Sequence, residues 1–63
     1  MPPELLTIGE AAAWLRIPAW TLRKWRSQGK GPHAAKIGKH LRYSADELAR
    51  WYQEQEARDR ASA

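Results

Sequence analysis

The sequence predicts a mainly α-helical domain that carries one small β-hairpin. Three observations lead to this fold class: capping signals precede two apolar segments with helical spacing, a proline separates two short helical segments, and an alternating stretch surrounds a single glycine. A chain of 63 residues is long enough for one small hydrophobic core. We therefore expect one domain over residues 7–57, with an arm over residues 1–6 and a frayed tail over residues 58–63.

The segment TIGE predicts the start of the first helix. Thr7 is the expected N-cap, and Glu10, three residues later, is placed to reach back and complete a capping box. The apolar residues that follow at helical spacing form the expected buried stripe: Ile8, Ala11, Ala12 and Leu15. Small alanines on this stripe let another helix approach closely.

Pro18 is expected to end the first helix, because proline restrains the residue before it and suits the first turn of a new helix. The second helix should run over about residues 18–28, with Gly29 beyond its end. Leu22 and Trp25 are its expected inward residues. The outward residues are predicted to be Ala19, Trp20, Arg23, Lys24 and Ser27.

The stretch KIGKHLRY predicts a hairpin with two possible registers. A loop over residues 38–40 pairs Ile37 with Leu41, whereas a two-residue turn over residues 38–39 pairs Ile37 with His40. We favour the longer loop, because facing residues then match in character.

The longer loop gives the hairpin two different faces. Its apolar face consists of Ala35, Ile37, Leu41 and Tyr43. Lys36 and Arg42 take the other face, with Lys39 and His40 at the tip. The hairpin is thus expected to rest its apolar face on the core and to present a basic edge to an anion.

The segment SADE predicts the start of a third helix, with Ser44 as N-cap and Glu47 as its partner in a second capping box. Its expected apolar face comprises Leu48, Trp51, Tyr52 and Gln55. The apolar period ends near Ala57, and we expect fraying beyond it.

Three tryptophans are expected in the core, because large aromatic side chains at inward spacing are usually buried: Trp14, Trp25 and Trp51.

Charge is separated along the chain. The formal net charge is +4, yet residues 16–42 contain eight basic side chains and no acidic one. Such segregation indicates a face that binds a polyanion, of which nucleic acid is the commonest. A solvated basic surface that serves solubility is the alternative.

Several function classes are disfavoured by composition. The chain has no cysteine, and its two histidines alone make a poor zinc site, so we expect no metal and no cofactor. No catalytic signature is present, which predicts a protein that is not an enzyme. The longest apolar run is too short to span a bilayer and the first residues do not resemble a signal peptide, so we expect a cytoplasmic location.

Two helices joined by a short turn, the second with outward Arg and Lys, form a helix-turn-helix pattern, and a following hairpin makes it winged. The segment TIGEAAAWLRIPAWTLRKWRSQGKGP, followed by AKIGKHLRYSADELARWY, resembles the winged-helix domain of phage excisionases within the MerR-like group. The resemblance covers residues 5–52. It implies a winged helix-turn-helix fold with three helices and a two-stranded antiparallel wing.

The resemblance also implies a recombination directionality factor encoded by a phage or mobile element in a bacterial host. Such a protein binds repeats in double-stranded DNA beside an attachment site, side by side with further copies, bends the DNA and directs a site-specific integrase toward excision. By this likeness Trp20, Lys24 and Ser27 occupy base-reading positions, with Arg23 beside them. The hairpin adds further expected DNA contacts: Lys36, Lys39, His40 and Arg42.

Two other functions remain open at this stage. A small winged-helix transcriptional regulator would use the same fold at an operator, and a basic protein-interaction module would bind an acidic partner. Two side chains also have more than one expected role. Trp20 can contact DNA, a neighbouring protomer or its own domain, and Arg26 can contact DNA or cover Trp25 with its aliphatic stem.

Overall fold

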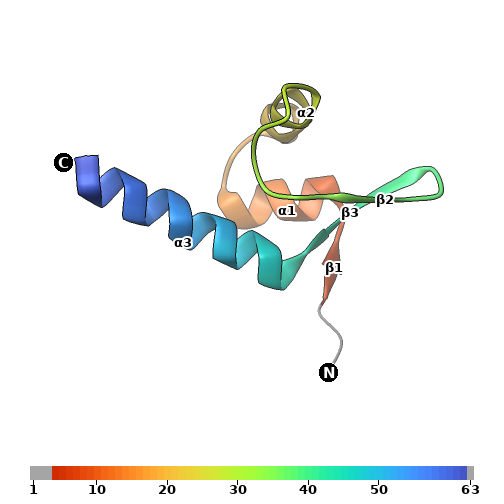
Figure 1. Ribbon diagram of the computed structural model, residues 1–63. Coiled ribbons are helices and arrows are strands. Elements are labelled where there is room, and N and C mark those ends of the chain that lie inside the picture. Colours follow the sequence, from red (N-terminus) through yellow and green to blue (C-terminus); the bar gives the residue numbers. More distant parts are fainter. Residues whose placement is uncertain (1–3, 63) are drawn as a thin grey trace.

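A computed structural model describes residues 4–62, in which three helices pack with a small antiparallel sheet (Figure 1). The helices are α1 (Ile8–Leu15), α2 (Ala19–Ser27) and α3 (Ala45–Ser62). The strands are β1 (Leu5–Leu6), β2 (Ala35–Ile37) and β3 (His40–Ser44), in the order β1-β3-β2. This confirms the predicted winged helix-turn-helix fold, with one strand more than expected because Leu5 and Leu6 pair with the end of β3.

Helix α1 begins at the predicted capping box. The Thr7 hydroxyl accepts from the Glu10 backbone N–H at 3.1 Å, and the Glu10 carboxylate accepts from the Thr7 N–H at 2.8 Å. The helix ends at Arg16, whose backbone is left-handed with φ 58°, and the Ile17 N–H returns to the Ala12 carbonyl at 3.0 Å. This left-handed residue turns the chain toward α2.

Helix α2 lies one residue inside each of its predicted limits. Pro18 precedes it, Gln28 follows it, and Gly29 takes a left-handed conformation with φ 71°. Leu22 is buried, as predicted for an inward residue. The prediction that Ala19 points outward is wrong: Ala19 is half-buried and packs against the core, because α2 packs against α1.

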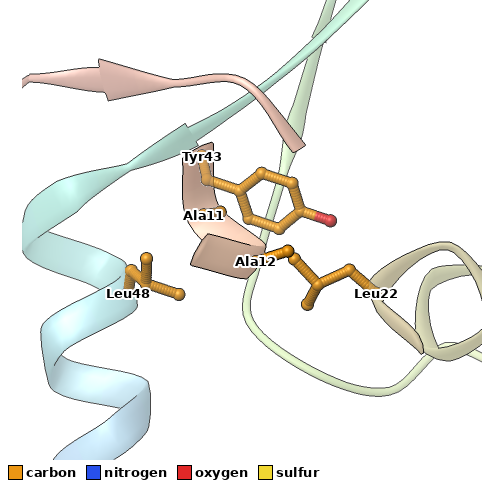
Figure 2. Close-up of a cluster of buried hydrophobic side chains, with 5 residues drawn as sticks. All are labelled: Ala11, Ala12, Leu22, Tyr43 and Leu48. Carbon is orange, nitrogen blue, oxygen red and sulfur yellow. The ribbon is translucent and has the colours of Figure 1, made fainter. Parts of the chain in front are cut away.

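The buried core contains side chains from all three helices and from β3: Ala11, Ala12, Leu22, Tyr43 and Leu48. In Figure 2 the Tyr43 ring lies against the two alanines of α1, while Leu22 and Leu48 reach the cluster from α2 and α3. A methyl group at each alanine position leaves room for the tyrosine ring. The core therefore connects the helix-turn-helix to the base of the hairpin.

The register of the hairpin differs from the favoured prediction. Strand β2 pairs with β3 through Ile37 and His40, so the turn has two residues and not three. Gly38 adopts φ 62°, the positive φ that a two-residue hairpin turn requires at its first central position. Matching side-chain character across the strands was therefore outweighed by turn geometry.

The corrected register also changes both faces of the hairpin. Facing residues share one side of a hairpin, so Lys36 lies on the face of Leu41, while Ile37 lies on the face of His40 and Arg42. The predicted apolar face is wrong, since every residue of β2 is exposed, and Ile37 retains 54% exposure. Strand β2 extends beyond the core, and its side chains have no apolar layer to cover.

Helix α3 starts at the predicted residue, with one of the two bonds of the expected capping box, and ends later than predicted. The Ser44 hydroxyl accepts from the Glu47 N–H at 3.5 Å, and the helix continues past Ala57 to Ser62. Its last turns are exposed and contain residues of good helix propensity, with an i,i+4 ion pair between Glu56 and Arg60. Figure 1 shows this end of α3 projecting away from the other elements.

Two aromatic pairs connect α3 to the helix-turn-helix. Trp25 and Trp51 lie with ring centroids 5.7 Å apart. Both are half-buried and Trp25 packs against the buried core, so their predicted core positions are confirmed only in part. Trp14 contradicts its prediction: it is 51% exposed and meets Tyr52 edge to face at 6.1 Å. The small core encloses one aromatic ring, that of Tyr43, and Trp14 lies outside it.

Candidate nucleic-acid interface

The outward side of α2 presents a continuous stripe of four exposed residues, which we call the α2 stripe: Trp20, Arg23, Lys24 and Ser27. Their spacing of i, i+3, i+4 and i+7 places them on one face of a helix. Leu22, on another face, is buried in the core. The structure thus brings together all four residues predicted for this helix and holds them on an anchored element.

The N-terminus of α2 is suited to an anion. Its N-cap, Pro18, makes no side-chain hydrogen bond to the helix, and the first turn contains no acidic residue. Free N–H groups at this end and the helix dipole favour negative charge. Because Trp20 lies in the same turn, a phosphate at this end would sit beside the start of the α2 stripe.

Ser27 has a restricted hydrogen-bonding role. Its hydroxyl donates to the Lys24 carbonyl at 2.8 Å, within the same helix. The oxygen then offers lone pairs and no proton. In a major groove it would accept from the amino group of adenine or cytosine.

The hairpin carries the remaining predicted residues in two separate groups. Lys39, in the turn, and His40, beside it, are exposed at the tip as expected. Lys36 and Arg42, predicted to share one basic face, lie instead on opposite faces of the hairpin. The Arg42 guanidinium is partly buried and donates to the Leu41 carbonyl at 2.8 Å.

This separation has a useful consequence for binding in a groove. A two-stranded ribbon between two phosphate backbones turns one face to each of them. Lys36 and Arg42 would then each meet a different strand of a duplex. The hairpin therefore carries one cation on each of its two faces.

Arg26 lies at the edge of α2 near the base of the hairpin. It is exposed, and its positive charge acts on the Tyr43 hydroxyl: burial raises the pKa of Tyr43, and the Arg26 charge opposes part of that rise. Sequence reasoning left Arg26 open between two roles. The structure places its charge close to β3.

Sequence reasoning missed the exposed side of the hairpin. The apolar character that Ile37 shares with Leu41 predicts a core position, yet Ile37 is exposed between cations. The signal that identifies its true position is the glycine at residue 38, which favours the shorter turn.

A family model described as a helix-turn-helix domain matches residues 5–56. The chain belongs to this helix-turn-helix family. A comparison with curated proteins finds no significant match. In the part of the chain that the structure describes, no helix is long and apolar enough to cross a membrane.

Membership in the helix-turn-helix family indicates that the protein binds DNA. In such domains the second helix enters the major groove, and here that helix is α2. A domain of this kind recognises DNA through surface side chains. The α2 stripe is therefore the candidate reading surface of this domain.

Proposed function

We propose that this protein is an excisionase: it binds repeats in double-stranded DNA beside an attachment site, bends the DNA and directs a site-specific integrase toward excision. Two features support this proposal. The short sequence motifs of this chain resemble those of phage excisionases, and they lie on α1, α2 and the hairpin of a helix-turn-helix domain. We place the protein in the cytoplasm of a bacterial host, encoded by a phage or mobile element.

The observation that carries the proposal is the α2 stripe on a helix whose other side is buried. Trp20, Lys24 and Ser27 would face base edges in the major groove, with Arg23 beside them. An anchored helix fixes the distances between these side chains. Fixed distances are what recognition of a particular base sequence requires.

The hairpin supplies a second contact in the adjacent minor groove. Lys39 would enter the groove, where the negative potential of narrow A·T-rich sequence attracts a cation. His40 lies beside it at the tip, and Lys36 and Arg42 would meet the phosphates of the two strands. Contact in two neighbouring grooves favours curved DNA, and copies bound side by side would add their curvature.

The first test is a gel-shift titration against salt with a duplex selected from a random pool. About five phosphate contacts predict a log–log slope of roughly −4 to −5, because each contact releases condensed counterions. Lys24→Ala should weaken binding, whereas Arg58→Ala, which removes an exposed cation from α3, should not. A slope near zero would instead favour a basic module that binds acidic proteins.

The second test separates an excisionase from a small transcriptional regulator with the same fold. The genome is examined for an integrase gene and an attachment site beside this gene. Excision by that integrase is then measured with and without the protein. Stimulated excision is expected, while DNA binding with no effect on excision would assign the protein to gene regulation.

A further inference from the structure

Ile37 occupies an unusual position on the hairpin. It forms the last pair before the turn, opposite His40, and 54% of its surface is exposed. Lys36 precedes it, Lys39 follows two residues later, and Arg42 shares its face. A branched aliphatic side chain thus lies among cations at the end of a projecting element.

Packing within the domain does not account for this residue. Among the described residues, Ile37 belongs neither to the buried core nor to the apolar side chains packed around it. All of β2 is exposed, and the hairpin tip points away from the helices in Figure 1. A single exposed isoleucine is ordinary on a protein surface, so it is the location, between groove-directed cations, that requires an explanation.

The cations around Ile37 indicate where this side chain would lie in a complex with DNA. If Lys39 enters the minor groove, Ile37 is carried with it, since one residue separates the two. An aliphatic group cannot hydrogen-bond to base edges. Its favourable environment in a duplex is the apolar surface exposed when two stacked base pairs separate, and minor-groove proteins insert Ile, Leu, Phe, Met or Pro in this way.

We propose that Ile37 is an apolar wedge that the hairpin inserts at one base step of the minor groove, and that this insertion kinks the duplex. The inference rests on the proposed function, which places the hairpin in that groove. Ile37 forms the last pair before the turn and so reaches deeper into the groove than Arg42, which shares its face and would hold the phosphates beside the opened step.

The wedge specifies a class of DNA sequence. Pyrimidine–purine steps such as TpA unstack easily, whereas A-tracts are stiff and have a narrow minor groove. A hairpin that acts through charge alone prefers the A-tract. A hairpin that acts through Ile37 prefers TpA at the same A·T content.

The test uses three duplexes that differ only under the hairpin: an A-tract, an A·T sequence with a central TpA step, and a G·C sequence. Affinity is measured by gel shift and bending by energy transfer between the duplex ends. Wild type should bind the TpA duplex about fivefold more tightly than the A-tract, because the step opens more easily. Ile37→Ala should still bind, lose that preference and bend the DNA less.

Two control variants make the outcome specific. Leu5→Ala removes another exposed aliphatic side chain, 53% exposed on β1, and should behave as wild type. Lys39→Ala reports insertion of the hairpin independently, through loss of the preference for either A·T duplex over G·C. Thermal melting confirms that every variant is folded.

The outcomes distinguish the two proposals. Preference for the A-tract, with bending unchanged in Ile37→Ala, overturns the wedge and leaves the hairpin in the groove. If wild type and Lys39→Ala each bind all three duplexes equally, the hairpin does not enter the minor groove. That result overturns both this inference and the part of the proposed function that places the hairpin there.

Discussion

Helix α2 and the hairpin both present cations to solvent, but they are held in different ways. Helix α2 is fixed to the core by Leu22, which is 1% exposed. The hairpin is anchored at its base by Tyr43, and its outer strand β2 is exposed along its whole length. The comparison indicates different roles for the two elements. Helix α2 keeps the distances between its outward side chains fixed, as base recognition requires, while the hairpin can adjust to the width of a groove.

The largest expected effect comes from breaking the anchor of α2. Leu22→Ala should lower the free energy of unfolding by about 2–5 kcal/mol, since it leaves a cavity in a core of five residues. Such a loss approaches the whole stability of a small domain. Lys36→Ala, on exposed β2, should change the free energy of unfolding by less than about 0.5 kcal/mol. Chemical denaturation measures both, and equal stabilities would show that α2 is no better anchored than the hairpin.

The loop between α2 and the hairpin offers a matched pair of glycines. Gly29 and Gly31 both have positive φ. A Cβ added at Gly31 would lie 3.1 Å from the Trp25 ring, whereas a Cβ added at Gly29 would have no atom within 4 Å. Gly29→Ala should cost about 1 kcal/mol through backbone strain, and Gly31→Ala about 2 kcal/mol because crowding is added. Thermal melts of the two variants test this order. The reverse order would mean that Trp25 is not packed against this loop.

A smaller effect on stability is expected from a substitution in the turn between α1 and α2. Arg16 holds a left-handed backbone, which costs a non-glycine residue about 1 kcal/mol or more. Arg16→Gly should therefore stabilise the fold by roughly 0.5–1 kcal/mol and raise Tm by a few degrees. The matched variant Arg58→Gly, within α3, should lower Tm. A lower Tm for Arg16→Gly would contradict the left-handed turn.

The smallest expected effect concerns the base of the hairpin. Burial raises the pKa of Tyr43 above its ordinary value of 10.0. Above about pH 10 the unfolded chain loses this proton while the folded chain keeps it, so stability falls as pH rises and is unaffected below that range. Melts between neutral pH and about pH 11 should show a steeper decline for wild type than for Tyr43→Phe. Tyr52→Phe is the control, and an equal decline in wild type and Tyr43→Phe would contradict burial of the hydroxyl.

Local chemistry made the helices predictable. The capping box at Thr7 and the glycine after α2 each act over a few residues, and each was found where the sequence placed it, while α1 ends at Leu15, shortly before the break predicted at Pro18. The α2 stripe followed from helical spacing once the inward position of Leu22 was known.

The hairpin and the aromatic residues depend on contacts that local patterns do not contain. Side-chain matching favoured a register that turn geometry at Gly38 overruled. Trp14 has the inward spacing of a core residue, but it lies at the surface beside Tyr52. The strand at Leu5 depends on pairing with a residue far along the chain, Ser44.

One footprinting measurement tests most directly the claim that α2 occupies the major groove and the hairpin the adjacent minor groove. Dimethyl sulfate methylates guanine N7 in the major groove and adenine N3 in the minor groove, so one reagent reports on both grooves of a selected duplex. We predict protection of guanine N7 at the centre of the site and of adenine N3 in the flanking minor groove, with only the adenine protection lost in Lys39→Ala. Protection confined to guanine N7, and unchanged by Lys39→Ala, would contradict two-groove binding.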